Sequence, residues 1–205
     1  MIALLLSSWL AMPLYPLNPA AQDTVAAMTL HLAVGMSGPS NVLSIAPEFS
    51  TRWEFLISHP FVIRAGIDYR FPSVNSNQYP NGRVHAGTIS SELLYYRGTR
   101  KVTGYLGAGV VYMLNNFSPD DRTADSLRTT EAITDVSMRD SFGYRLSFGL
   151  RFKRTLSVEV GITQLSPGFV FVRRSSPNSF QVSRETVRLN DFRVSIGYLI
   201  SLKRI

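Results

Sequence analysis

The chain has 205 residues and no cysteine, and its 21 lysines and arginines against 14 aspartates and glutamates give a formal charge of +7. This length corresponds to one domain, and the lack of cysteine excludes a disulfide framework, a thiol nucleophile and a thiolate metal site. The basic residues are spread over turns and loops rather than beside an aromatic platform, so we expect no nucleic-acid partner.

The first residues resemble an export signal. Ile2 to Leu14 is an apolar run of thirteen residues, followed by Pro-Leu-Asn-Pro-Ala-Ala-Gln. Such a run is too short to cross a bilayer as a helix, so we predict a signal peptide over residues 1–21 and one barrel domain over residues 22–205. No lysine or arginine precedes the run, and the alternative is a membrane anchor interrupted by Pro13 and Pro16.

Large apolar residues then alternate with small or polar ones in eight segments. In Ser141–Phe152, the bulky set that begins with Phe142 and Tyr144 alternates with a set that includes Gly143 and Arg145. Strand side chains point alternately to opposite faces, and a bulky outer face around a polar interior is typical of a transmembrane barrel. The predicted strands are Met28–Ser37, Val42–Ile57, Phe61–Phe71, Val84–Tyr96, Val102–Met113, Ser141–Phe152, Leu156–Leu165 and Phe192–Leu202.

Two details qualify this pattern. In the second segment Leu43 falls on the outward face, and Pro47 removes a backbone donor, which predicts a bulge or strand break near it. In the fourth segment Leu94 falls among the inward polar residues.

The connections alternate between short and long. Tight turns are expected at Ser58–Pro60, Arg97–Arg100 and Lys153–Thr155, and long loops at Pro72–Arg83, Leu114–Asp140 and Ser166–Asn190. This alternation brings all the long loops to one end, as in outer-membrane barrels. The predicted fold is therefore all-β, an eight-stranded antiparallel up-and-down transmembrane β-barrel.

Phrases such as Glu92-Leu-Leu-Tyr-Tyr and Gly104-Tyr-Leu-Gly-Ala-Gly-Val-Val-Tyr, together with the pattern over Met28–Leu202, carry a family resemblance. The chain resembles the small outer-membrane β-barrel proteins of the OmpA, OmpX and OmpW type, including the "porin family" barrels. The resemblance implies a monomer in the outer membrane of a Gram-negative bacterium, in contact with its lipids.

Eight strands enclose a space that side chains can just fill, which disfavours an open channel. The inward residues include six bases and five acids, a near balance that predicts a neutral network plugging the lumen. A tight turn at Ser58–Pro60 would bring Glu54 opposite Arg64 and Glu48 opposite Arg70. The predicted lumen network is Glu48, Arg52, Glu54, Arg64, Asp68, Arg70, Glu92, Arg145, Arg151, Glu159 and Arg193.

We therefore expect a non-enzymatic protein without cofactor or metal, with a structural or surface-interaction role. One alternative is a narrow channel for small or apolar solutes. Another is a lipid-modifying enzyme, because the predicted register places His31 opposite Glu48 and near Ser195 or Ser201. The His-x-Ser signature of lipid A deacylases is absent at all three histidines. A soluble β-sandwich would need a partner to cover its aromatic face.

The two longest loops carry opposite charge. Leu114–Asp140 is rich in aspartate, whereas Ser166–Asn190 is rich in arginine, so the loops could pair over the barrel mouth. Alternatively, arginines of the second loop could bind phosphates of lipopolysaccharide. These are Arg173, Arg174, Arg184 and Arg188. The run that starts at Gly168 resembles a strand continuing beyond the membrane as a projecting hairpin.

Overall fold

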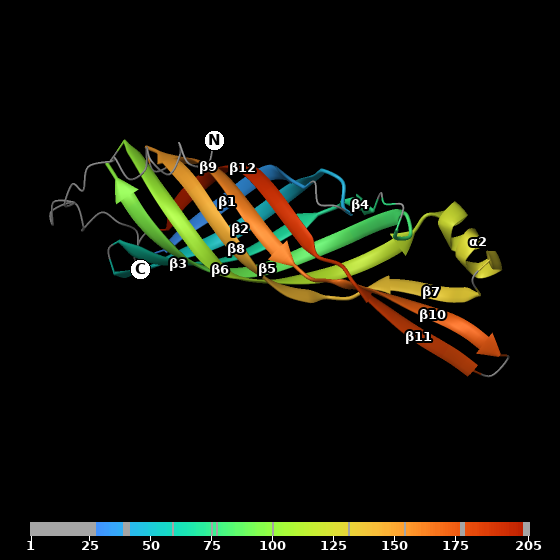
Figure 1. Ribbon diagram of the computed structural model, residues 1–205. Coiled ribbons are helices and arrows are strands. Elements are labelled where there is room, and N and C mark those ends of the chain that lie inside the picture. Colours follow the sequence, from blue (N-terminus) through green and yellow to red (C-terminus); the bar gives the residue numbers. More distant parts are fainter. Residues whose placement is uncertain are drawn as a thin grey trace.

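A computed structural model describes residues 28–202, apart from residues 39–41, 59, 75, 77, 100, 131, 154 and 177–178. The predicted signal segment, residues 1–21, lies outside the described residues. Eight long strands dominate the structure (Figure 1). They are β1 (Met28–Ser37), β2 (Ala46–Ser58), β3 (Phe61–Arg70), β5 (Gly82–Gly98), β6 (Val102–Pro119), β8 (Ser141–Phe152), β9 (Leu156–Leu165) and β12 (Leu189–Leu202).

These strands form one closed antiparallel barrel. Neighbouring strands pair in the order β3-β2-β1-β12-β9-β8-β6-β5, and β5 pairs back with β3. The last strand closes the barrel by pairing with the whole of β1, from Met28 opposite Leu202 to Ser37 opposite Arg193. The predicted eight-stranded up-and-down barrel is therefore confirmed.

The alternation in the sequence becomes the two faces of the barrel wall. On β8, Phe142 and Tyr144 are 75% and 71% exposed, whereas Arg145 between Tyr144 and Leu146 is 3% exposed. Exposed large apolar side chains follow the outer face of every barrel strand, which is the surface that a bilayer covers. Among the described residues, no helix is long and apolar enough to cross a membrane.

The start of β2 differs from the prediction. The strand begins at Ala46 rather than Val42, and Leu43 is 4% exposed and bridges to Val74 instead of facing outward. Pro47 is the second residue of the strand, where a missing donor interrupts little of the ladder. The predicted strand break near Pro47 is correct, while the register shift in this hairpin lies farther along, between Leu56 and Ser58.

The long connections contain regular structure at one end of the barrel (Figure 1). The predicted loop Leu114–Asp140 holds the end of β6, α2 (Asp121–Thr130) and β7 (Ile133–Met138), and β4 (Ser73–Val74) lies before β5. The predicted loop Ser166–Asn190 forms a hairpin of β10 (Gly168–Ser176) and β11 (Ser179–Thr186), as the sequence indicates. β7 pairs with β10, so the two oppositely charged segments associate through a three-stranded sheet.

The polarity of the barrel reverses at this end. On β5, Ser90 and Glu92 face inward and Ile89 faces outward at 52% exposure, whereas farther out Val84 is buried inside and Arg83 is exposed. The inward residues of the outer end form an apolar cluster with β7 and β10 that includes Met113, Phe117, Phe169 and Leu189. An apolar interior with a polar exterior is the arrangement of a water-soluble domain, so the reversal marks where the wall leaves the bilayer.

Candidate functional site

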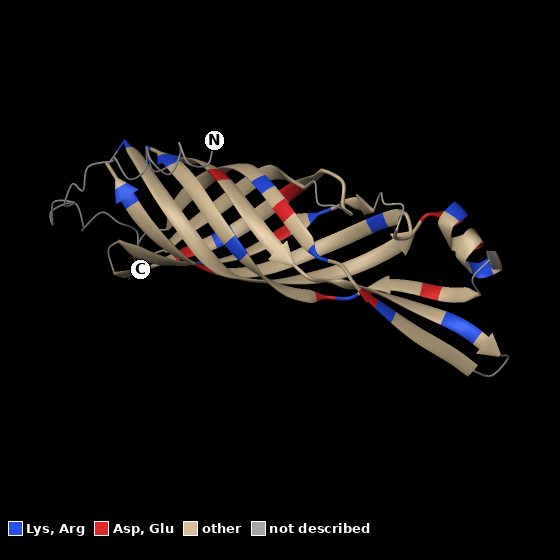
Figure 2. Ribbon diagram, viewed as in Figure 1, with Lys and Arg blue, Asp and Glu red and all other residues tan. Residues whose placement is uncertain are grey.

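The structure places all the predicted lumen residues inside the barrel. Ten of the eleven are buried, and the Arg151 side chain is 14% exposed. They come from β2, β3, β5, β8, β9 and β12, and Figure 2 shows acidic and basic positions interspersed along these strands. Buried charges are tolerated when each is paired and hydrogen-bonded, so the contacts inside the lumen decide what this site can do.

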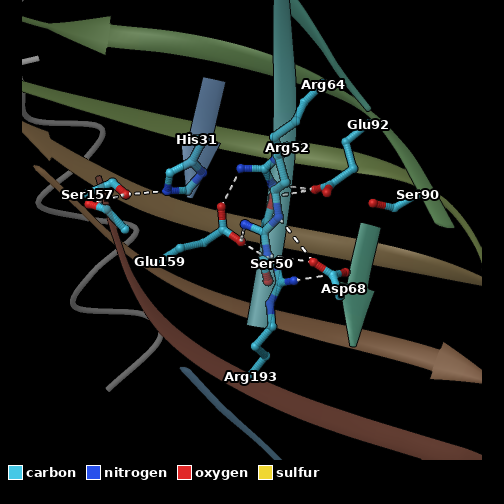
Figure 3. Close-up of polar contacts among 12 residues, drawn as sticks. His31, Ser50, Arg52, Arg64, Asp68, Ser90, Glu92, Ser157, Glu159 and Arg193 are labelled. Atoms are coloured by element: carbon cyan, nitrogen blue, oxygen red, sulfur yellow. Dashed lines mark hydrogen bonds and ion pairs between the residues drawn. The ribbon is translucent and has the colours of Figure 1, made fainter. Parts of the chain in front are cut away.

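Glu159 lies at the centre of the network (Figure 3). Its carboxylate accepts hydrogen bonds from Arg52 at 2.9 Å and from the Tyr105 hydroxyl at 2.5 Å, and it also pairs with Arg64 and Arg193. Gly149 makes room for Tyr105, because a Cβ there would lie 2.2 Å from the Tyr105 Cζ. One carboxylate thereby joins guanidinium groups from three different strands.

Two further carboxylates cross-link the same region. Asp68 accepts hydrogen bonds from three arginines, Arg145 at 2.6 Å, Arg52 at 3.1 Å and Arg193 at 3.4 Å. Glu92 accepts from Arg64 at 2.7 Å and from the Ser147 hydroxyl at 2.8 Å. Because Arg52, Arg64 and Arg193 each bind at least two of these three carboxylates, the centre of the network is continuous rather than a set of separate pairs.

At the outer end of the network, Arg70 pairs with Asp191, a residue absent from the predicted set. Asp191 is 5% exposed and lies two residues before Arg193 on the inward face of β12. Including it, the interior of the described barrel holds six arginines and six carboxylates. The lumen therefore has balanced formal charge, where the sequence indicated an excess of one base.

At the other end, near the short turns, Arg151 pairs with Glu54. The Tyr96 hydroxyl also donates to Glu54 at 3.2 Å, and the Arg151 guanidinium lies 4.7 Å from the centre of the Tyr96 ring. The predicted registers of Glu54 opposite Arg64 and Glu48 opposite Arg70 are both present. Opposite register does not fix the ion pair, however, since Glu48 pairs at 3.2 Å with Arg193, two strands away on β12, rather than with Arg70.

The predicted surroundings of His31 are wrong. His31 lies opposite Arg52, and Glu48 lies opposite Gly35. The partner of the imidazole is Ser157, whose hydroxyl is 2.7 Å from Nε2, and not Ser195 or Ser201 (Figure 3). Both side chains are 1% exposed, and Nδ1 has no hydrogen-bond partner in the part of the chain that the structure describes. The third group that would orient a catalytic histidine is therefore lacking among these residues.

The four arginines of the β10–β11 hairpin fall on two faces. Arg174 and Arg184 share a face with Val170, Val172 and Val182, because Val170 is opposite Arg184 and Val172 is opposite Val182. Arg188 lies just beyond β11 and is exposed, while its neighbours Val187 and Leu189 are buried. It therefore continues the alternation of exposed and buried residues into the start of β12. Arg173 lies on the other face, opposite Gln181 and beside a surface cleft.

Among the described residues, no group of three or more His, Cys, Asp or Glu side chains could hold a metal ion. Each acidic group of the lumen already pairs with a guanidinium group. Several basic residues lie at or near the short turns. Arg97, Lys101 and Lys153 are among the described residues, while Arg100, Arg154, Lys203 and Arg204 lie outside them.

No protein-family model and no curated protein sequence matches this chain. The solved structures with a similar fold include the outer membrane protein OprG from Pseudomonas aeruginosa, with a TM-score of 0.60, 11% identity, and coverage of 86% of this chain and 97% of OprG. The structure of the outer membrane protein AlkL in lipid bilayers has a TM-score of 0.57 and 12% identity, and the match covers 93% of this chain and 97% of AlkL. Neisserial surface protein A has a TM-score of 0.51 and 12% identity, and the match covers 86% of this chain and 98% of that protein. The chain thus has the fold of the small outer-membrane β-barrels, and its predicted location in the bacterial outer membrane agrees with it.

Proposed function

We propose that this barrel is a closed, non-enzymatic protein of the outer membrane that acts at the cell surface through its β10–β11 hairpin. The observation that carries the first half of the proposal is the lumen, where six arginines and six carboxylates bind one another across the barrel. Above them the apolar cluster around Phe169 and Leu189, both 0% exposed, covers the network. An ion would have to break buried charge pairs and cross an apolar layer, both of which are costly.

Conductance in planar bilayers tests the closed lumen. We expect the wild-type barrel to give no discrete current steps, because the charge network fills the interior that eight strands enclose. A variant with Arg52→Ala and Glu159→Ala, which empties the centre of the network, serves as the comparison that should conduct if it still folds. Discrete steps from the wild-type protein would instead favour a narrow channel.

The second half of the proposal concerns the outer face of the hairpin. Val182 and Phe180 on this face are 54% and 60% exposed. This exposure is unusual at the loop end, where the barrel otherwise has an apolar interior and a polar exterior. Val170 lies five residues beyond Leu165, the last residue of β9, on the part of the chain that extends past the reversal of polarity. Apolar residues beside Arg174 and Arg184 on this face fit a surface that is partly lipid and partly anionic.

Lipopolysaccharide has this chemistry, because its acyl chains are apolar and its phosphates suit the forked donors of arginine. We therefore assign Arg174, Arg184 and Arg188 as phosphate contacts, and Arg173, on the opposite face, not as one. The valines of this face, of which Val182 is exposed and Val170 and Val172 are half-buried, would lie against the outer edge of the lipid layer. This divides the predicted lipopolysaccharide set according to the face of the hairpin.

A binding assay with purified protein in detergent separates the two faces. Replacing Arg174, Arg184 and Arg188 together with glutamine should weaken binding of phosphorylated lipopolysaccharide by roughly tenfold or more, since charge-assisted hydrogen bonds contribute about 1.5–3 kcal/mol each. Arg173→Gln is the matched control and should bind as wild type. Equal binding by all three proteins, or equal binding of dephosphorylated lipopolysaccharide, would contradict the phosphate assignment.

One contact favours a second candidate, a serine-dependent enzyme. Ser157 and His31 are within hydrogen-bond distance at 2.7 Å, as a nucleophile and its base would be. Their 1% exposure argues against access by a lipid substrate. A fluorophosphonate probe that labels the wild-type protein but not Ser157→Ala would favour the enzyme, whereas we expect labelling of neither.

A further inference from the structure

A cleft of about 370 Å³ opens at the loop end of the barrel, on the inner side of the β10–β11 hairpin. Residues from four parts of the chain line it: the loop before β5, α2, β7 and the hairpin (Figure 1). Its volume lies near the lower end of the roughly 300–1,000 Å³ found for small-molecule sites. The cleft is therefore of a size for a small organic molecule.

Two aromatic rings of the cleft are held in place by a third. Tyr79 and Phe171 line the cleft, and both contact Phe169, which is 0% exposed. Tyr79 stacks on Phe169 with ring centres 5.2 Å apart and an interplanar angle of 20°, and the Phe171 ring lies 6.2 Å from Phe169 at 32°. Phe169 also meets Phe117 edge-on within the apolar cluster. The two lining rings are therefore fixed in position, and the faces of such rings attract cations.

The Glu185 carboxylate is the charged group of the cleft that is open to a ligand. Glu185 is an exposed residue of β11 directly opposite Phe169 on β10, so its side chain lies on the same face of the hairpin as the rings. Within the described part of the chain, Glu185 makes no ion pair. Arg173 also lines the cleft, but it already interacts with another residue of the chain. Arg174 and Arg184 lie on the opposite face of the hairpin.

Aromatic faces beside an available carboxylate suit an organic ammonium ion. An anion would be repelled by Glu185, and an apolar molecule would desolvate the carboxylate without pairing it. A metal ion needs several ligands, and among the described residues no group of three or more His, Cys, Asp or Glu side chains could supply them. An alkylammonium ion pairs with the carboxylate and lays its alkyl groups on the rings, as in the aromatic cages that bind quaternary ammonium groups.

We propose that this cleft binds a small organic ammonium ion, with its nitrogen beside the Glu185 carboxylate and its alkyl groups on Tyr79 and Phe171. Tyr79 presents to the ligand the ring face that Phe169 does not cover. The site goes beyond the proposed function and does not rest on it, because the phosphate contacts lie on the other face of the hairpin. The ammonium group has two sources, free amines in solution and the choline headgroup of a phospholipid.

Choline and its neutral isostere 3,3-dimethyl-1-butanol test the proposal. The two molecules have nearly the same shape, but only choline is charged. The assay is isothermal titration of the wild-type protein in nanodiscs of phosphatidylglycerol, a lipid without an ammonium group, with empty nanodiscs as the blank. We expect saturable binding of choline at least tenfold tighter than that of the isostere. Equal affinities, or no binding of choline at millimolar concentration, would overturn the proposal.

Vesicles distinguish the two sources of the ammonium group. The protein in nanodiscs is mixed with vesicles of phosphatidylcholine or of phosphatidylglycerol, and the vesicles are sedimented. Sedimentation with phosphatidylcholine alone, prevented by free choline, would assign the ligand to a lipid headgroup. Binding of choline without sedimentation would assign it to free amines.

Substitutions locate the binding in the cleft. Glu185→Gln and Tyr79→Ala should each weaken choline binding at least tenfold, while Tyr79→Phe, which keeps the ring, should retain it. The matched control is Asp125→Asn, which removes an exposed carboxylate from α2, the helix that also contributes Leu127 to the cleft. Its affinity for choline should stay within twofold of wild type. Gel mobility before and after heating reports whether each variant still folds.

Two results would refute the site. Unchanged binding in folded Glu185→Gln would place the cation elsewhere on the protein. An equal loss in Asp125→Asn and Glu185→Gln would mean that choline responds to the overall charge of the loops and not to one carboxylate beside the rings.

Discussion

Replacing the Glu159 carboxylate by an amide tests whether the lumen network holds the barrel together. Glu159 is 1% exposed and binds Arg52, Arg64 and Arg193 as well as the Tyr105 hydroxyl. Glu159→Gln preserves the shape but leaves six arginines of the lumen facing five carboxylates. Removing one partner of a buried ion pair costs about 3–5 kcal/mol, because the remaining charge stays desolvated.

The expected loss can be measured as a shift of the unfolding midpoint. For a chain of this size 1 kcal/mol corresponds to about 2–4 °C, so Glu159→Gln should unfold roughly 6–20 °C below wild type. The assay is the temperature at which the compact form disappears on an SDS gel, with tryptophan fluorescence in urea as a second readout. Adding Arg64→Gln should recover part of the loss if charge imbalance is its cause.

The control is Glu185→Gln, the same chemical change at an exposed position on β11. Its midpoint should stay close to wild type, since exposed substitutions usually change stability by less than about 0.5 kcal/mol. Equal midpoints for Glu159→Gln and Glu185→Gln would refute the reasoning. Backbone hydrogen bonds and lipid contacts would then account for the stability, and the network would serve only to fill the lumen.

Two other substitutions test particular contacts. Gly197→Ala should lower the free energy of unfolding by about 1–3 kcal/mol, because the new Cβ would lie 1.9 Å from the Nε2 of His31. Gly87→Ala is the control, because no heavy atom lies within 4 Å of its new Cβ, and it should unfold at or above the wild-type midpoint. Similar midpoints for these two variants would show that the His31 contact is easily relieved. Asp191→Asn should destabilise the barrel by about 3–5 kcal/mol through Arg70, and the double variant with Arg70→Gln should lie closer to wild type than Asp191→Asn does. Simple additivity of the two changes would mean that this pair is not coupled.

The sequence predicts the strands and part of the register for a physical reason. Lipid outside and polar contacts inside impose a period of two on every strand, so the faces of β8 follow from the order of its residues. Where a tight turn joins two strands, the turn also fixes the register, and Glu54 accordingly lies opposite Arg64. The link from β1 to β2 is longer, which leaves the offset open, and His31 consequently lies opposite Arg52 instead of Glu48.

The contacts across the lumen could not be derived in the same way. Glu159 binds Arg52 from 107 positions away, and which strands face each other depends on the tilt and stagger of the closed barrel. Asp191 was missed although a signal was present, because the alternation of inward residues continues from Arg193 back through Asp191 to Leu189. The charged loop before β8 gave little indication of β7, which acquires its place by pairing with β10.

The reversal of polarity along β5 provides a test of where the bilayer ends. Arg83 and Ile89 both point outward, but beside Arg83 the interior residue is the apolar Val84, and beside Ile89 it is the polar Ser90. A wall in water buries its apolar side, whereas a wall in lipid exposes it, so the boundary should fall between these two positions. The chain has no cysteine, which allows single cysteines to be introduced without background. On intact cells, Arg83→Cys should react with a membrane-impermeant maleimide and Ile89→Cys should not. Reaction of both cysteines would mean that β5 leaves the membrane below Ile89, and the hairpin would then stand too far from the lipid for Arg184 to reach a phosphate.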